Sequence, residues 1–243
     1  MSRLSTIKIV IYRKTLHIFF CIVLFAPYMT FLSSGLDSYG VTPVMFYSIL
    51  AIIATTINAV QIKRPLIRLE IKNLLQEKRR KIIEELLKTF PTEMSIITKS
   101  LKYEEELRKL EDHFNDYIDR MERSYEKIGG YIGITHGIIG VLIASILFGN
   151  YAAYGILALM IIDPVAAIVG VAFGKHKIPK TDGSIEGSMA GYLAFFLLLL
   201  ITGFDINVAL LLSLVATLTE LIAVEDNLFI PLLTAALAYF LQV

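Results

Sequence analysis

The chain has 243 residues, 56% of them hydrophobic, and a formal net charge of +1 at pH 7. That apolar content, with a mean hydropathy of +0.66, excludes an ordinary soluble domain and favours a membrane protein. Cys21 is the single cysteine. It excludes an internal disulfide and gives no information on the redox compartment.

Several apolar runs are long enough, or nearly so, to cross a bilayer core of about 30 Å. They are 15–33, 42–62, 128–149, 151–172, 189–203, 206–223 and 227–243. We therefore predict an all-α, polytopic integral membrane protein with about seven transmembrane helices. The first run lacks a small-residue cleavage site and is long enough to span, so we expect no cleavable signal peptide.

The predicted domain organisation has three parts. Residues 1–62 carry the first two transmembrane helices, 63–127 form a cytosolic helical hairpin, and 128–243 carry helices three to seven. The middle part holds 16 basic and 14 acidic residues, and its apolar residues recur every three or four positions, as on a helix face. A spacer or a homodimer contact is the first interpretation, and a membrane-surface role is the alternative.

The positive charges predict the orientation in the membrane. With the N-terminus inside, the N-terminal segment, 63–127 and 173–188 share one side and hold all 23 Lys and Arg residues. The opposite loops carry only Asp37 and Asp205. The positive-inside rule then places the N-terminus in the cytosol and the C-terminus on the opposite side.

Ionisable side chains in the apolar runs are the candidates for chemistry, because a charge in hydrocarbon is costly and usually faces a cavity or a partner. Asp163, about ten residues from the cytosolic end of its run, is the strongest candidate. The others lie toward the same side: Arg13, Lys14, His17, His136, Glu220, Asp226 and Asn227. Each of these residues also has a structural alternative. His17 would extend to the membrane surface, His136 would hydrogen-bond another helix, and Arg13 with Lys14 would set the orientation of the chain in the membrane.

The stretch from Asp163 to Ser188, DPVAAIVGVAFGKHKIPKTDGSIEGS, combines several unusual features. Asp163 followed by Pro164 matches an N-cap and a first helical position, so we expect a half-helix to begin there. Gly170 and Gly174 would let a ligand approach the backbone. Basic side chains and free amides beside carboxylates suit a phosphate chain and a divalent cation. The loop candidates are Lys175, Lys177, Lys180, Ser184, Glu186, Gly187 and Ser188.

This stretch resembles the signature of the CTP-dependent polyprenol kinases, the family of dolichol kinase, phytol kinase and a CTP-using diacylglycerol kinase. The resemblance extends to RKTLH at 13–17 and to EDNLFIP at 225–231. One departure is Gly183, which stands where the family commonly has a lysine. Phosphatidate cytidylyltransferases share a similar Asp-Gly-Gly-Glu-Gly stretch, but this chain lacks their C-terminal Pro-Gly-His-Gly-Gly motif.

The resemblance implies a kinase that transfers the terminal phosphate of CTP to a lipid alcohol, with Mg²⁺ as the expected cation. Asp163 would bind the metal or accept the hydroxyl proton, and Glu186 with Asp226 would complete the metal site. The phosphates would contact Lys175, Lys177, Lys180, Arg13 and Lys14. The expected partners are the lipid substrate and the bilayer, and no nucleic acid. A cytidylyltransferase and an ion-coupled transporter are the alternatives.

Overall fold

The computed structural model describes residues 3–63, 132–179, 181 and 183–243, together with scattered positions between 70 and 110. The predicted hairpin at 63–127 lies almost entirely outside the described residues, and Lys180 lies outside them as well. The chain divides into two compact units, one formed by 1–57 with 131–243 and the other by 58–130. The first unit contains the candidate site.

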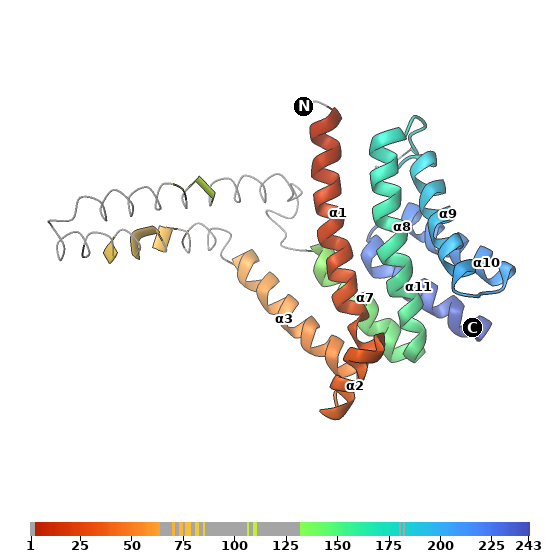
Figure 1. Cartoon of the computed structure of the whole chain (residues 1–243), viewed down its shortest axis with the longest axis horizontal. Coiled ribbons are helices and arrows are strands. Elements are labelled where there is room, and N and C mark those ends of the chain that lie inside the picture. The colour runs from red at the N-terminus through yellow and green to blue at the C-terminus, as the bar shows by residue number, and fades with distance from the viewer. Residues whose placement is uncertain are drawn as a thin grey trace. The chain divides into compact units, whose positions relative to one another are not determined.

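Helices account for the regular structure of the described residues. They are α1 (Arg3–Phe25), η1 (Ala26–Tyr28), α2 (Thr30–Ser38), α3 (Pro43–Lys63), α7 (Ile132–Phe148), η2 (Gly149–Tyr151), α8 (Ala152–Phe173), α9 (Ile185–Ile201), α10 (Ile206–Ile222) and α11 (Asp226–Leu241) (Figure 1). An isolated antiparallel bridge joins Lys177 and Ser184. The all-α class is therefore confirmed for this part of the chain.

Among the described residues, three apolar helical stretches are long enough to cross a membrane. They are Thr6–Tyr28, Pro43–Lys63 and Ile132–Phe173, the last of which folds into α7 and α8 with the short turn η2 between them. Helices α9, α10 and α11 are also apolar but have only 17, 17 and 16 residues. The long apolar helices indicate a membrane protein, and the count of seven spans stays a prediction.

The first helix begins earlier than the sequence predicted. It starts at Arg3 instead of near residue 15 and ends at Phe25, where the 3₁₀ turn Ala26–Tyr28 follows. Lys14 and His17 consequently lie inside a helix, several turns from its start. The expected boundary was wrong because it was drawn at the basic residues, and a lysine that has a partner inside the fold does not end a helix.

The predicted half-helix at Pro164 is also wrong. Helix α8 runs without interruption from Ala152 to Phe173 and contains Pro164 in its interior. A proline removes one backbone donor and crowds the preceding turn, but membrane helices tolerate this where neighbouring helices pack around it. Pro164 is fully buried, so surrounding side chains hold the helix together there.

Helix α8 is the central element and packs against α1, α9 and α11 (Figure 1). Glycines allow the close contacts: a Cβ added to Gly155 would collide with the backbone of Pro231 on α11. A Cβ on Gly140 of α7 would lie 2.5 Å from the carbonyl oxygen of Leu228. This is the helix-packing role that small residues have in membrane proteins.

Candidate active site

Asp163 is paired with a lysine in the interior of the helix bundle. Asp163 lies on α8 and Lys14 on α1, and each residue is only 5% exposed. Lys14 Nζ donates a hydrogen bond to Asp163 Oδ1 over 2.5 Å. Removing either charge from water is costly unless a partner of opposite charge is well placed. Each side chain therefore makes the burial of the other tolerable.

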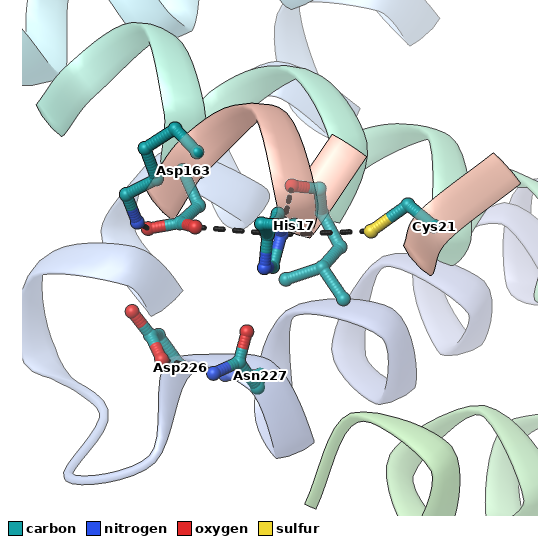
Figure 2. Close-up of polar contacts among 7 residues, drawn as sticks. His17, Cys21, Asp163, Asp226 and Asn227 are labelled. Carbon is teal, nitrogen blue, oxygen red and sulfur yellow. Dashed lines mark hydrogen bonds and ion pairs between the residues drawn. The ribbon is translucent and has the colours of Figure 1, made fainter. Parts of the chain in front are cut away.

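His17 joins this pair from the same face of α1, three residues after Lys14. Its Nε2 lies 3.4 Å from Asp163 Oδ2 and 3.4 Å from the carbonyl oxygen of Leu159, one turn earlier on α8. Cys21 places its Sγ 3.5 Å from the same nitrogen (Figure 2). His17 is thus held between α1 and α8 by these contacts.

The first turn of α11 faces this group. The side chains of Asp226 and Asn227 point toward His17 and Asp163 (Figure 2). Asp226 interacts electrostatically with His17 and with Glu220. The backbone N–H of Asn227 donates to Asp226 Oδ1 over 2.7 Å, so the Asp226 carboxylate is held at the positive end of a helix, where an anion is stabilised.

Glu220 adds a third carboxylate from the last turn of α10. It interacts electrostatically with Asp163, Asp226 and Lys14. Ser188 of α9 lies beside Glu220, yet Ser188 Oγ and Glu220 Oε2 are buried without a hydrogen bond of normal geometry to the described residues. Buried polar atoms generally have a partner, so these two have the capacity to bind a further polar group.

We call Lys14, His17, Asp163, Glu220 and Asp226 the charged cluster. Its members come from α1, α8, α10 and α11, which are distant in the sequence. Arg13 also interacts electrostatically with Asp163. The structure therefore brings together five of the candidates that the sequence placed toward one side, and it pairs Lys14 with Asp163.

His136 and Glu225 lie next to the cluster without belonging to it. His136 Nδ1 is 3.2 Å from Glu225 Oε2, but the angle is not that of a hydrogen bond. Beside His136 on α7, a Cβ added to Gly137 would lie 3.9 Å from Asn227 Cβ. His136 thus contacts the corner between α10 and α11, which fits the helix-contact interpretation of this residue.

The basic loop between α8 and α9 is a small hairpin-like turn. The bridge between Lys177 and Ser184 closes it, with Ile178 N donating to Gly183 O over 3.2 Å and Ile185 N to His176 O over 3.0 Å. Lys175, His176 and Lys177 are exposed. These side chains are therefore accessible to an anionic ligand in water.

Glu186 contacts this loop. His176 Nδ1 lies 2.7 Å from Glu186 Oε1, and the backbone N–H of His176 donates to both carboxylate oxygens. The His176 side chain, followed by backbone N–H groups, lowers the pKa of Glu186 to about 2, because hydrogen bonds to a carboxylate favour its ionised form. Glu186 lies in the first turn of α9, before the predicted span 189–203. Its contacts with His176 therefore fix the loop to α9.

The glycines and serines of the signature join α8 to α9. Ser184 is the N-cap of α9, and its Oγ accepts a hydrogen bond from Gly187 N over 3.1 Å. A Cβ on Gly174 would lie 2.5 Å from Ser184 Oγ, and one on Gly187 would lie 3.0 Å from the Cα of Gly170. Helix packing thus accounts for these glycines. Nucleotide binding by Gly170, Gly174, Ser184, Gly187 and Ser188 stays a prediction.

The predicted metal ligands are not assembled into one site. The described residues contain no group of three His, Cys, Asp or Glu side chains arranged to hold a metal ion. Glu186 is engaged by His176. Mg²⁺ commonly takes one or two carboxylates and completes its shell with substrate phosphates and water. Asp163 and Asp226 fit that pattern, because both face the same space (Figure 2).

Sequence reasoning missed two partners of His17. Cys21 and the carbonyl oxygen of Leu159 both contact its ring. The spacing of Lys14, His17 and Cys21 (i, i+3, i+7) places them on one helix face, so this pattern could have revealed Cys21. No pattern in the sequence indicated Leu159, because a backbone contact depends on how two helices pack.

Two known proteins match part of the chain. It is 32% identical over 107 residues to an uncharacterized protein of Methanocaldococcus jannaschii, covering 42% of this chain and 56% of that protein. It is 32% identical over 130 residues to the dolichol kinase sec59 of Schizosaccharomyces pombe, covering 48% of this chain and 26% of the kinase. The chain therefore spans about half or less of these relatives. No protein-family model matches it, and no solved structure does.

Proposed function

Because the chain is related to the polyprenol kinase family, we propose that it is a membrane lipid kinase that uses CTP and a polyprenol-type alcohol, dolichol or a shorter prenol. The observation that carries this proposal is the buried pair of Lys14 and Asp163 with two further carboxylates in electrostatic contact. A hydroxyl at the end of a lipid has to be activated below the membrane surface. The charged cluster places the ion pair of Lys14 and Asp163 inside a bundle of apolar helices.

In the proposed reaction, the lipid hydroxyl oxygen attacks the terminal phosphorus of CTP. The bond from that phosphorus to its bridging oxygen breaks, CDP leaves, and a lipid monophosphate forms. The hydroxyl proton passes to Asp163, which Lys14 holds in a fixed orientation. Phosphoryl transfer depends mainly on positioning and on stabilisation of charge, and a positioned base typically contributes about 10²–10⁴-fold.

The nucleotide is assigned to the basic loop. Lys175 and Lys177 are exposed there, and Lys180 follows them in the sequence. Gly174 ends α8 eleven residues after Asp163, which corresponds to about 16 Å along a helix. The phosphate chain would therefore extend from the loop toward the charged cluster.

The proposal includes a divalent cation, expected to be Mg²⁺, which Asp163 and Asp226 would bind. When bound, it would neutralise charge on the phosphates. The N-terminus and the site are assigned to the cytosolic side, where the basic residues lie, and the C-terminus to the opposite side.

An assay with CTP carrying radiolabel in its terminal phosphate tests this proposal. Purified protein is incubated with dolichol, a shorter prenol and diacylglycerol in parallel. We expect label in a prenol-type lipid monophosphate, and CDP as the second product. In a parallel incubation with a lipid phosphate, release of the label as pyrophosphate together with an unlabelled CDP-lipid would instead identify a cytidylyltransferase. Protein that modifies neither an alcohol nor a lipid phosphate, but moves ions across vesicles, would support the transporter alternative.

A further inference from the structure

An apolar groove of about 420 Å³ lies between α10 and α11. Leu218, Ile222 and Ala223 contribute from α10 and its C-cap, and Phe229 and Leu233 contribute from α11. This volume falls within the range of ligand sites in proteins, about 300–1,000 Å³. The groove lies within the helical unit that holds the charged cluster.

The groove offers no free polar group to a ligand among its described lining residues. Its one hydroxyl belongs to Thr219, and that hydroxyl donates to the carbonyl oxygen of Val215 over 2.7 Å. A polar ligand would lose its hydration here without gaining hydrogen bonds. The groove is therefore suited to a hydrocarbon chain.

The α11 wall of the groove leads directly to the charged cluster. Asp226, Phe229 and Leu233 are related as i, i+3 and i+7, so they share one face of α11. Asp226 interacts electrostatically with His17 and Glu220. Seven residues of helix correspond to about 10 Å. A chain lying along this face would place its end group beside Asp226.

We propose that this groove binds the part of the lipid alcohol's isoprenoid chain that is nearest the hydroxyl, an inference that rests on the proposed function. The charges favour an alcohol over an ordinary phospholipid. Glu225 and Asp226 precede the groove residue Phe229 by four and three residues, and Glu220 follows the groove residue Thr219 on α10. A neutral hydroxyl can approach these carboxylates directly, whereas an anionic phosphate is repelled by them unless a cation lies between, as proposed for CTP.

Bulky substitutions in the groove test this inference. Leu218→Trp and Leu233→Trp place an indole in opposite walls, and both leucines are 43% exposed, so the fold can accommodate the change. Leu214→Trp is the matched control, because Leu214 is 46% exposed on the same helix and lies outside the groove.

We expect the KM for a long polyprenol to rise at least about tenfold in both groove variants, the lower end of the effect of one methylene in an apolar pocket. The KM for CTP should not change, and the control should behave as wild type. Unchanged KM values for polyprenol in both groove variants would overturn the inference.

A second measurement does not depend on catalysis. A polyprenol that carries a photoreactive diazirine near its hydroxyl should crosslink to peptides from 215–233. Unlabelled polyprenol should compete for this labelling, and excess phosphatidylcholine should not. Equal competition by the phospholipid would show that the groove takes bulk lipid, and crosslinks elsewhere would place the chain at another surface. Wild-type protein that crosslinks as expected but shows no CTP-dependent phosphorylation would refute the proposed function and leave the groove assignment in place.

Discussion

Lys14 Nζ and Asp163 Oδ1 lie 2.5 Å apart although 149 positions separate the two residues in the chain. This contact joins the RKTLH segment near the N-terminus to the Asp163–Ser188 stretch. Without it, both segments would carry an unpaired charge in an apolar helix. The pair therefore has two separable consequences, one for the stability of the bundle and one for the proposed chemistry.

The first prediction separates these two consequences. Asp163→Asn leaves Lys14 buried without its anion, and Lys14→Gln leaves Asp163 without its cation. Breaking a buried pair from one side costs about 3–5 kcal/mol, so both single variants should unfold at lower temperature in detergent. If Asp163 had no partner, Asp163→Asn would instead raise the unfolding temperature, because the substitution would remove an isolated charge from the membrane.

The double variant Asp163→Asn with Lys14→Gln is the control. It removes both charges of the buried pair, although Glu220 loses its interaction with Lys14, so its thermal stability should recover part of the loss. The rate of CTP-dependent phosphorylation should remain at least about 10²-fold below wild type, as expected when a positioned base is removed. Recovery of activity together with stability would show that Asp163 has a structural role only.

The convergence of the charged cluster is predictable from the sequence, and its internal pairing is not. Charges in apolar runs are costly, and this rule by itself selects Asp163, His17 and Glu220. The assignment of Lys14 to phosphates came from the family resemblance, and neither that resemblance nor a count of charges reveals which helices touch. The contact depends on the packing of α1 against α8, which no local pattern specifies.

The error at Pro164 and the close packing of the signature glycines have a common physical origin. In both places a local signal predicted a break or an opening in the backbone. In the structure, neighbouring helices fill the space: Pro164 is buried within α8, and the first turn of α9 packs on Gly170. The apolar pattern of the sequence predicts the helices. It does not predict which neighbouring helix packs against a proline or a glycine, because that depends on tertiary contacts.

The second prediction concerns the lysine that the basic loop lacks at Gly183. If Lys180 contacts the CTP phosphates, Lys180→Ala should raise the KM for CTP about two- to fivefold, within the roughly 0.2–1 kcal/mol of an exposed charge pair. Adding Gly183→Lys should partly reverse this. A Cβ at Gly183 would lie 3.4 Å from Thr181 Oγ1 and farther from other atoms, so the site can accept a side chain.

Gly174→Ala provides the contrast for the loop. Its Cβ would lie 2.5 Å from Ser184 Oγ, so this variant should lose thermal stability. An unchanged KM for CTP in Lys180→Ala would assign Lys180 to membrane orientation only.

The third prediction tests the sidedness. Cysteines are introduced one at a time at Ser100 and Ser38 in a Cys21→Ala background. Ser100 lies in the predicted cytosolic segment 63–127, and Ser38 lies in the predicted outer loop 34–41. A membrane-impermeant maleimide added to intact cells should label the cysteine at 38, and should label the one at 100 only after permeabilisation. Labelling of position 100 from outside would reverse or break the predicted topology.

The fourth prediction concerns the contact between His176 and Glu186, which ties the basic loop to α9. Because the folded protein lowers the pKa of Glu186 from its ordinary value of 4.5 to about 2, the contact stabilises the loop at neutral pH, and this stabilisation is lost as the pH falls from about 4.5 toward 2. The titration midpoint of the Glu186 carboxyl, followed by NMR of ¹³C-labelled glutamate, should therefore lie near 2.

His176→Ala removes the main hydrogen-bonding side chain and should raise the midpoint toward 4.5. Lys175→Ala is the control: it leaves the Lys175 backbone N–H in place and should keep the midpoint low. A midpoint that does not move in His176→Ala would show that backbone N–H groups alone hold the carboxylate, and the loop would then keep its attachment to α9 without the histidine.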